Sequence, residues 1–423
     1  MARQKVIALF PEASFGAALN CVGIAQELRR LGARPVFICQ ENFRSVFSEY
    51  GFAEYSLTSE AKGGEANWTD FITRHKDAFR QSPLDQITSY VAPTWEAIVD
   101  TAIRAEQPLR RLLAQIKPDA IVLDNVVMFP AIADAGVPWI RVVSCAETEI
   151  PDPKVPPYLS GLDSKPDEAW NAFSSRYLRE VAPAHRRMNA FLADCGRKPY
   201  PTGEFLEPSP YLNLLLSPEI VRFEREKPFD KNRFVYLDGC VRHEAPYSLP
   251  TFAACNDRPL ILTSFGSLGA MDAEMMQRMI GVFAGMPYRF VVNVGSWRDQ
   301  YGAVPDNVMI ESWFPQPLLV AQSSVFIHHG GNNSFCEALY FGVPSLVMPY
   351  CWDGHDNATR AENTGVGRKL PRYDWTDAEL VSAIESLAGD TAMQQRLRAN
   401  SERMKEAAGV TVAARSILDL MKG

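Results

Sequence analysis

Residues 324–341, SVFIHHGGNNSFCEALYF, decide the predicted fold. The first four residues form a short apolar run typical of a buried strand, and residues 335–341 fit a helix. Between them, two glycines would let the backbone approach a ligand closely, and the start of the helix would offer free amides and the positive end of its dipole. Taken alone, the pattern favours a capped strand-to-helix turn over an anion-binding site.

The same alternation of strand and helix recurs along the whole chain. Its order predicts parallel sheets with right-handed crossovers. We therefore predict an α/β chain of two doubly wound, Rossmann-like domains that face each other across a cleft, with ligands at the carboxyl ends of the strands. The expected strands are residues 6–10, 35–39, 120–124 and 139–144 in the first half, and 260–266, 288–294, 308–310, 324–327 and 345–348 in the second.

A change of composition at residues 243–258 indicates a linker between the two domains. We predict a first domain over residues 1–245 and a second over residues 246–404, and a helix at about 405–423 could pack back on the first domain. Clustered prolines and aromatic residues interrupt the pattern at 145–210. They fit a packed surface loop and a substrate-binding lid about equally well.

The composition limits the class of protein. With 423 residues, 47% of them apolar, and a net charge of −7, the chain is typical of a globular protein and a poor nucleic-acid binder. The apolar run at residues 6–10 is too short for a signal peptide, and no run approaches the roughly 18 apolar residues that cross a bilayer. The eight cysteines lack a Cys-x-x-Cys pair and the six histidines lack metal-ligand spacing. We expect a cytoplasmic protein without disulfides or bound metal, as a monomer or homodimer.

Three side chains around residues 324–341 suit a nucleotide. Glu337 follows Ser334 by three residues, so both lie on one helical face, and its carboxylate could accept both hydroxyls of a ribose. Trp313 follows the preceding strand, where an indole could stack on a nucleobase. Asp353 stands in a later strand-end loop, where a carboxylate could bind sugar hydroxyls.

Together, residues 313–357 resemble the nucleotide-sugar signature of glycosyltransferase family 1, which includes plant secondary-product and bacterial macrolide glycosyltransferases. Residues 264–267 are similar to the loop that opens the second domain of this family. The resemblance implies the GT-B arrangement of two domains and a donor site with assigned roles. In that site Trp313 stacks on the base, Gln316 and Glu337 bind the ribose, His329, Gly331, Asn333 and Ser334 hold the diphosphate, Asp353 binds the sugar, and Ser267 completes the site.

The resemblance also implies a reaction. A sugar would pass with inversion, and without a metal, from a nucleotide diphosphate sugar to the hydroxyl of a small acceptor, such as a natural product or a xenobiotic. The donor is expected to be a UDP-sugar and serves as co-substrate, with no further cofactor. The chain has no Asp-x-Asp motif of the kind that holds a metal-bound diphosphate.

Two positions depart from the family pattern. The family usually carries glutamine after the aspartate at 353, where this chain has Gly354, so the donor sugar is open and His355 or Asn357 could replace the lost contact. The histidine that the family uses as a base would fall at Ala17. Asp124 matches the aspartate that orients this histidine.

Without that histidine, three hypotheses stay open. Glu12 or Asp124 could act as the base, because carboxylates at strand ends can face a cleft, and such a base would keep activity high down to mildly acidic pH. Alternatively, the acceptor is acidic enough to need little help, or the chain binds a nucleotide sugar without transferring it. Glu12 could also be a solvated charge and Asp124 a helix cap. A nucleotide-sugar epimerase on the same fold is a further alternative.

Overall fold

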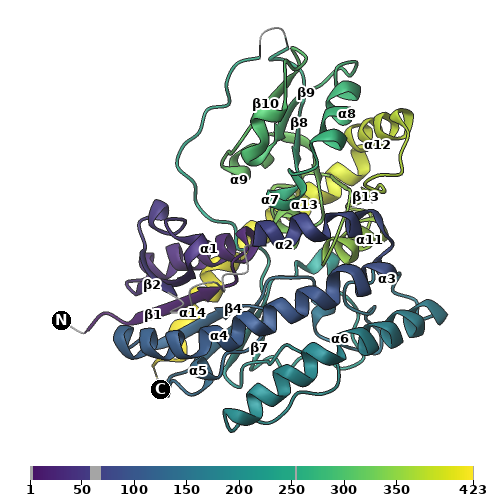
Figure 1. Cartoon of the computed structure of the whole chain (residues 1–423). Coiled ribbons are helices and arrows are strands. Elements are labelled where there is room, and N and C mark those ends of the chain that lie inside the picture. Colours follow the sequence, from purple (N-terminus) through teal and green to yellow (C-terminus); the bar gives the residue numbers. More distant parts are fainter. Residues whose placement is uncertain (1–2, 58–67, 253–254, 423) are drawn as a thin grey trace. The chain divides into compact units, whose positions relative to one another are not determined.

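The computed structural model describes residues 3–57, 68–252 and 255–422, and the chain divides into two compact units (Figure 1). Unit 1 comprises Met1–Ser217, Phe223–Arg242 and Ala408–Gly423, and unit 2 comprises Pro218–Arg222 and His243–Ala407. The units divide at Arg242/His243 and at Ala407/Ala408, where the predicted domains had their boundaries at residues 245 and 404. The excursion of five residues at Pro218–Arg222 was not predicted.

Unit 1 is built on a seven-stranded sheet in which every pair of neighbouring strands is parallel. The strand order is β3-β2-β1-β4-β5-β6-β7, so the direction of winding reverses between β1 and β4. Ligands of doubly wound sheets bind at the carboxyl ends of strands at such a reversal. The strands are β1 Val6–Pro11, β2 Arg34–Gln40, β3 Ala53–Leu57, β4 Ala120–Asp124, β5 Trp139–Val143, β6 Leu212–Leu215 and β7 Phe234–Tyr236.

Helices connect these strands, and one helix comes from the far end of the chain. α14 packs against α1, and its Ala413, Ala414 and Ile417 are buried in the same apolar core as Leu28. The helices of unit 1 are α1 Phe15–Arg30, α2 Trp68–His75, α3 Pro83–Gln86, α4 Ala92–Ile116, α5 Pro130–Ala133, α6 Glu168–Asp194 and α14 Gly409–Asp419, with short helices at Glu41–Phe43, Ser48–Tyr50, Lys76–Arg80, Ile87–Val91 and Glu147–Glu149.

Unit 2 repeats the same design with a six-stranded parallel sheet of order β10-β9-β8-β11-β12-β13. Its winding reverses between β8 and β11. The strands are β8 Leu260–Ser264, β9 Arg289–Asn293, β10 Val308–Glu311, β11 Ser323–His328, β12 Ser345–Val347 and β13 Gly367–Lys369. The helices are α7 Gly266–Gly269, α8 Ala273–Phe283, α9 Gln316–Val320, α10 Asn332–Phe341, α11 Gly354–Asn363, α12 Asp377–Gly389 and α13 Thr391–Ala407, with short helices at Glu219–Val221 and Gly295–Gln300.

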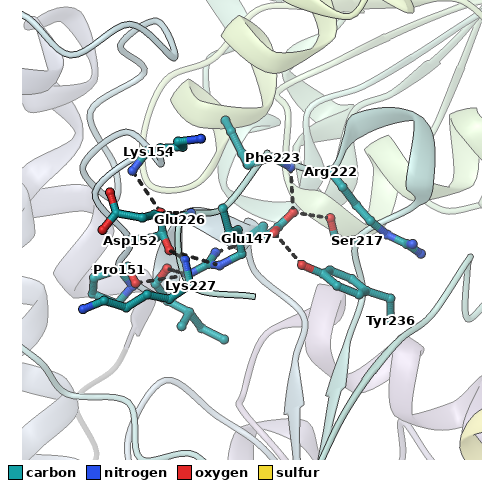
Figure 2. A network of polar contacts seen from close by, with 12 residues as sticks. Glu147, Pro151, Asp152, Lys154, Ser217, Arg222, Phe223, Glu226, Lys227 and Tyr236 are labelled. Atoms are coloured by element: carbon teal, nitrogen blue, oxygen red, sulfur yellow. Dashed lines mark hydrogen bonds and ion pairs between the residues drawn. The ribbon is translucent and has the colours of Figure 1, made fainter. Parts of the chain in front are cut away.

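The proline-rich segment is packed around one buried carboxylate (Figure 2). Oε2 of Glu147 accepts hydrogen bonds from Ser217 Oγ (2.9 Å) and from the backbone N–H of Phe223 (3.2 Å). Its Oε1 accepts from the hydroxyl of Tyr236 (2.8 Å) and lies 3.6 Å from Arg225 Nη1. A carboxylate with this many partners fixes the loop around it.

A second carboxylate, Asp152, secures the other end of this loop (Figure 2). Its carboxylate accepts hydrogen bonds from the backbone N–H groups of Lys154, Glu226 and Lys227. It also lies 3.9 Å from Arg225 Nε.

Farther along, the 27-residue helix α6 begins after the capping residue Asp167 and packs against α4. The segment 145–210 thus contains a packed loop followed by a long helix, which the prolines in the sequence did not indicate.

Candidate functional site

The Gly-rich loop predicted to hold phosphates lies at the carboxyl end of β11, where β11 neighbours β8. His328, the last residue of β11, is fully buried, and its Nδ1 accepts a hydrogen bond from the backbone N–H of Gly330 (3.1 Å). The imidazole of His329 lies instead against Gly266 of α7 and Gly331. The two adjacent histidines therefore have different environments, as the alternation of side chains along a strand requires.

Three glycines make the space that this arrangement needs. A Cβ atom on Gly331 would lie 2.5 Å from Nε2 of His329, and one on Gly266 would lie 3.1 Å from its Cε1. Gly330 has a φ of 90°, which favours glycine, and a Cβ there would lie 2.6 Å from the carbonyl oxygen of Gly354. Larger residues would push the imidazole or the loop away from the start of α10.

Four of the predicted donor-site residues share one hydrogen-bond network. Gln316, the first residue of α9, donates from Nε2 to Ser334 Oγ (3.1 Å) and to Glu337 Oε2 (2.7 Å). Asn333 donates from Nδ2 to Glu337 Oε1 (3.2 Å). Glu337 is only 1% exposed, so these amides hold its carboxylate in one orientation on α10. The structure thus brings Gln316 against Ser334 and Glu337, three of the residues predicted for the donor site.

Three further predicted donor residues lie near this network or on the same unit. Asp353 precedes α11, and its Oδ2 accepts a hydrogen bond from the backbone N–H of Asn332, the first residue of α10 (3.1 Å). The residue before it, Trp352, has a φ of 54°, a conformation that aromatic residues rarely adopt outside functional sites. Trp313 exposes 61% of its surface, an unusual fraction for an indole. The backbone of Ser267 lies in α7, and its side chain is outside the described part of the structure.

The electrostatic state of His329 follows from its surroundings. Burial, together with a smaller effect of the positive charge of Arg372, lowers the pKa of His329 to about 3. The imidazole is therefore neutral at physiological pH and can donate a hydrogen bond but supplies no charge. Its Nδ1 is buried and has no hydrogen-bond partner within residues 3–57, 68–252 and 255–422.

Gly354, which departs from the family pattern, has a packing role. A Cβ atom at this position would lie 2.5 Å from the carbonyl oxygen of His329. Asn357 donates from Nδ2 to the carbonyl oxygen of Gly330 (2.7 Å), so it holds the same loop from the first turns of α11. Burial lowers the pKa of His355 to about 3, with a smaller contribution from Lys369. Gly354 and Asn357 thus both pack against the backbone of the Gly-rich loop.

The two candidate catalytic carboxylates lie together in unit 1. Glu12 follows β1, and Asp124 ends β4, on the two strands between which the winding reverses. The register pairs Pro11 with Asp124, and the backbone N–H of Glu12 donates to the carbonyl oxygen of Asp124 (2.6 Å). This is the edge where a doubly wound sheet binds ligands.

Both carboxyl groups titrate near neutrality. Burial raises the pKa of Glu12 to about 7. For Asp124, burial raises the pKa most; the hydrogen bond from Ser144 opposes this and the charge of Glu12 adds to it, giving a value of about 8. The expectation of high activity in mild acid, which assumed ordinary carboxylates, is therefore wrong for either residue as base.

Other side chains take the place of the missing histidine around Asp124. Ala17 lies in the first turn of α1 and is 5% exposed. One turn later, Cys21 Sγ lies 3.8 Å from Asp124 Oδ2, and Ser144 Oγ donates to Asp124 Oδ1 (2.6 Å). Asp124 is thus bound to side chains on α1 and after β5, and the helix-cap alternative does not describe these contacts.

The sequence analysis missed Cys21, Ser144 and Arg372. Cys21 stands four residues after Ala17, and Ser144 directly follows β5, the strand next to β4, so both positions follow from helix and sheet geometry once Asp124 is chosen. Arg372 follows the last strand of unit 2 and has no neighbouring motif that would mark it.

Two parallel sheets of this order, the second with a Gly-rich loop before α10, define a GT-B protein. The chain is similar over 99% of its length to all of the kitacinnamycin glycotransferase crystal structure, with a TM-score of 0.72 and 21% identity. It is also similar over 99% of its length to all of the glycosyltransferase VinC in complex with dTDP, with a TM-score of 0.67 and 16% identity. The predicted GT-B fold is confirmed.

The sequence comparisons agree. Residues 285–415 match the family described as erythromycin biosynthesis protein CIII-like, C-terminal domain. The NDP-glycosyltransferase YjiC of Bacillus subtilis (strain 168) is 27% identical over 60% of this chain, and the match spans 65% of that relative, slightly less than two thirds. The oleandomycin glycosyltransferase of Streptomyces antibioticus is 22% identical over 96% of this chain and 89% of its own length. The resemblance to glycosyltransferases, first seen in residues 313–357, is thus confirmed.

The described residues contain neither a helix that could cross a membrane nor a cluster of side chains that could hold a metal ion. No helix in residues 3–57, 68–252 or 255–422 is long and apolar enough to cross a membrane. Over the same residues, no group of three or more His, Cys, Asp or Glu side chains could hold a metal ion.

Proposed function

We propose that this protein transfers a sugar from a nucleotide diphosphate sugar to a hydroxyl of a small acceptor molecule. The observation that carries the proposal is the network of Gln316, Asn333, Ser334 and Glu337 beside the loop of His329 at the carboxyl edge of unit 2. Two amides orient a buried carboxylate for ribose hydroxyls, while the start of α10 faces a diphosphate.

The exposed indole of Trp313 would stack on the nucleobase. We expect UDP-sugars as donors, and the dTDP bound to the related VinC makes dTDP-sugars the second donor class to test. The sugar itself would lie near Asp353, with no side chain at Gly354 to contact it.

The reaction that we propose is a single in-line displacement. The acceptor oxygen attacks the anomeric carbon, the bond from that carbon to the diphosphate oxygen breaks, and the proton of the hydroxyl passes to Glu12 or Asp124. One displacement inverts an α-linked donor to a β-glycoside and forms no covalent enzyme intermediate. Two carboxyl groups with a pKa near neutrality support this assignment of the base.

Donor binding is tested by replacing its central residues. His329→Ala and Glu337→Ala should each weaken UDP and dTDP binding in calorimetry by more than about tenfold, since a charged or buried hydrogen bond contributes about 1.5–3 kcal/mol. Glu402→Ala, on an exposed position of α13, is the matched control and should bind as the unchanged protein does. Equal binding by all variants would mean that the network is architectural.

Transfer is tested by incubating donor and protein with an acceptor library and detecting products by mass spectrometry. Glycosylated products support the proposal, and their anomeric configuration, read by NMR, tests inversion. Donor epimerised without an acceptor would indicate an epimerase, and tight donor binding without any turnover would indicate a binding protein.

The remaining parts of the proposal concern the conditions of the reaction. We propose that transfer needs no metal or other cofactor and that the protein is a cytoplasmic monomer or homodimer. Activity should be unchanged by EDTA, and mass measurement by light scattering should give one or two chains per particle. Loss of activity in EDTA that Mg²⁺ or Mn²⁺ restores would contradict the metal-independent mechanism.

A further inference from the structure

Unit 2 buries a guanidinium that the donor site described above does not use. Arg372 follows β13 at the carboxyl edge of the sheet and is 3% exposed. Its Nη2 donates to the carbonyl oxygen of Gly269 (2.9 Å), and its Nε donates to the hydroxyl of Tyr373 (3.3 Å). Its Cζ lies 4.4 Å from the ring centre of Phe265 and 4.7 Å from that of Tyr350.

In the described part of the chain, this charge has no direct anionic partner. Nη1 of Arg372 is buried without a hydrogen-bond partner, and no carboxylate in the described ranges 3–57, 68–252 and 255–422 forms an ion pair with it. Aromatic faces offset part of the cost of burial. Arginine does not lose its proton in proteins, so unit 2 keeps a permanent positive charge in its interior, and the carboxylate of Asp272 is connected to it through the hydroxyl of Tyr373.

The guanidinium lies close to the loop that holds His329. A Cβ atom on Gly266 would lie 3.1 Å from the imidazole of His329, and one on Gly269 would lie 3.4 Å from Arg372 Nη2. These glycines are three residues apart in the single turn of α7, so the imidazole and the guanidinium contact the same turn, and the charge of Arg372 is near enough to lower the pKa of His329. Tyr350 stacks on the imidazole, with ring centres 5.3 Å apart, and also contacts the guanidinium.

We propose that Arg372 is the counter-charge with which unit 2 binds the diphosphate of the donor. The inference rests on the proposed function and assigns to this residue the charge that the neutral imidazole of His329 lacks. The amides at the start of α10 and the imidazole give the hydrogen bonds, and the guanidinium gives a fixed positive potential. Because it is shielded from solvent, salt screens this potential less than that of a surface arginine.

The test compares ligands with and without the diphosphate. Arg372→Met should weaken UDP binding in calorimetry at least about tenfold, because a charge shielded from solvent attracts the diphosphate, and leave uridine binding unchanged. Arg278→Met is the matched control, since Arg278 also lies over an aromatic ring, that of Trp375 (3.7 Å), but is half-exposed and paired with Asp377 (2.9 Å). This control should bind UDP and uridine as the unchanged protein does.

Two results would overturn the proposal, namely unchanged UDP affinity in Arg372→Met or equal losses for UDP and uridine. A failure of the proposed function looks different, because the unchanged protein would then bind neither UDP nor dTDP. Pyrophosphate separates the two cases. Binding of pyrophosphate by the unchanged protein that Arg372→Met loses would support the counter-charge alone, and binding that Arg372→Met retains, or no binding by the unchanged protein, would overturn it.

Arg372→Lys covers the case in which Arg372→Met does not fold. Lysine keeps the charge but loses it more easily when buried, so UDP affinity should fall between about pH 7.5 and 9.5 in this variant and stay constant in the unchanged protein. The imidazole of His329 and the hydroxyls of Tyr350 and Tyr373, which contact the guanidinium or its neighbours, do not titrate there. The pKa of His329 is about 3, that of Tyr373, which bonds Asp272, is raised to about 12 by burial, and burial raises that of Tyr350 well above its usual value. An affinity independent of pH in Arg372→Lys would contradict the proposal.

Discussion

At the scale of single residues, Glu12 and Asp124 show how a place in the fold changes the chemistry of a carboxyl group. Each stands at the end of a central strand, where burial raises its pKa from an acidic value to about 7 or 8. Ala17 leaves no imidazole next to them, and Cys21 and Ser144 bind Asp124 in its place. Carboxyl groups that titrate near neutrality can take the role that a histidine has elsewhere.

Replacing these carboxyl groups tests their role in catalysis. We expect Glu12→Gln or Asp124→Asn, whichever removes the base, to lower kcat by about 10²–10⁴-fold while UDP affinity stays constant. A base must be deprotonated to work, so kcat/KM of the unchanged protein should fall as the pH drops through about 7 for Glu12, or about 8 for Asp124. Steady-state kinetics from pH 5 to 9 measure both effects.

The control for this experiment is Glu402→Gln, an exposed carboxyl group of α13. If both amide variants turn over normally, the base is neither residue. An acceptor that ionises in solution would then be the better explanation, and the rate should follow the pKa of the acceptor instead.

At the scale of elements, the loop after β11 and the start of α11 are packed backbone against backbone. Gly354→Ala places a Cβ atom 2.5 Å from the carbonyl oxygen of His329, so we expect a loss of about 1–3 kcal/mol in stability and at least about tenfold weaker UDP binding. Thermal unfolding and calorimetry measure these effects. Gly281→Ala, in α8 with open space around its Cα, should instead stabilise by about 0.5–1 kcal/mol and bind normally. Normal UDP binding by Gly354→Ala would show that the loop adapts.

The Glu147 network provides a second test at this scale (Figure 2). Glu147→Ala leaves the side chain of Arg225, 5% exposed, with only the more distant carboxylate of Asp152, and should cost about 3 kcal/mol or more of unfolding free energy. Ser217→Ala removes one hydrogen bond of the same carboxylate and should cost about 1 kcal/mol. Urea unfolding measures both. Similar small losses would mean that the ion pair contributes little.

The elements also show how far the sequence could be interpreted. The apolar runs at residues 120–124 and 324–327 lie in fully parallel sheets, where both faces of a strand are buried, and such runs are readily recognised. The contacts of Gln316 with Ser334 and Glu337 follow from the same logic, because all three stand at one sheet edge. The role of Gly354 depends on backbone distances between two loops, which no spacing in the sequence reports.

Helix α6 marks another limit. Prolines near residue 150 suggested a loop, yet Pro183 lies inside a 27-residue helix, where its contacts with α4 outweigh a weak local propensity. The importance of Arg372 could not be predicted from the sequence for a related reason. Its importance comes from what surrounds it, and an arginine after a strand is ordinary in the sequence.

At the scale of the whole molecule, the two units share one chain that passes between them more than once. Unit 1 contains both ends of the chain, because α14 completes its core with Ile417, which is fully buried. Thr411 Oγ1 also donates to Glu27 Oε1 of α1 (2.7 Å). The C-terminal residues are therefore needed for the stability of unit 1, although they follow unit 2 in the sequence.

This dependence predicts which unit each change destabilises. At a UDP concentration of a hundred times Kd, binding should add about 2.7 kcal/mol to the free energy of unfolding of unit 2. In scanning calorimetry its unfolding temperature should therefore rise, which identifies its transition. Ile417→Ala should lower the other transition, since losing a buried isoleucine costs about 2–5 kcal/mol. Leu387→Ala, equally buried on α12, is the matched change in unit 2 and should lower the transition that UDP raises. If Ile417→Ala lowered the UDP-sensitive transition instead, the stability of α14 would belong to unit 2, and its packing in the core of unit 1 would contribute little.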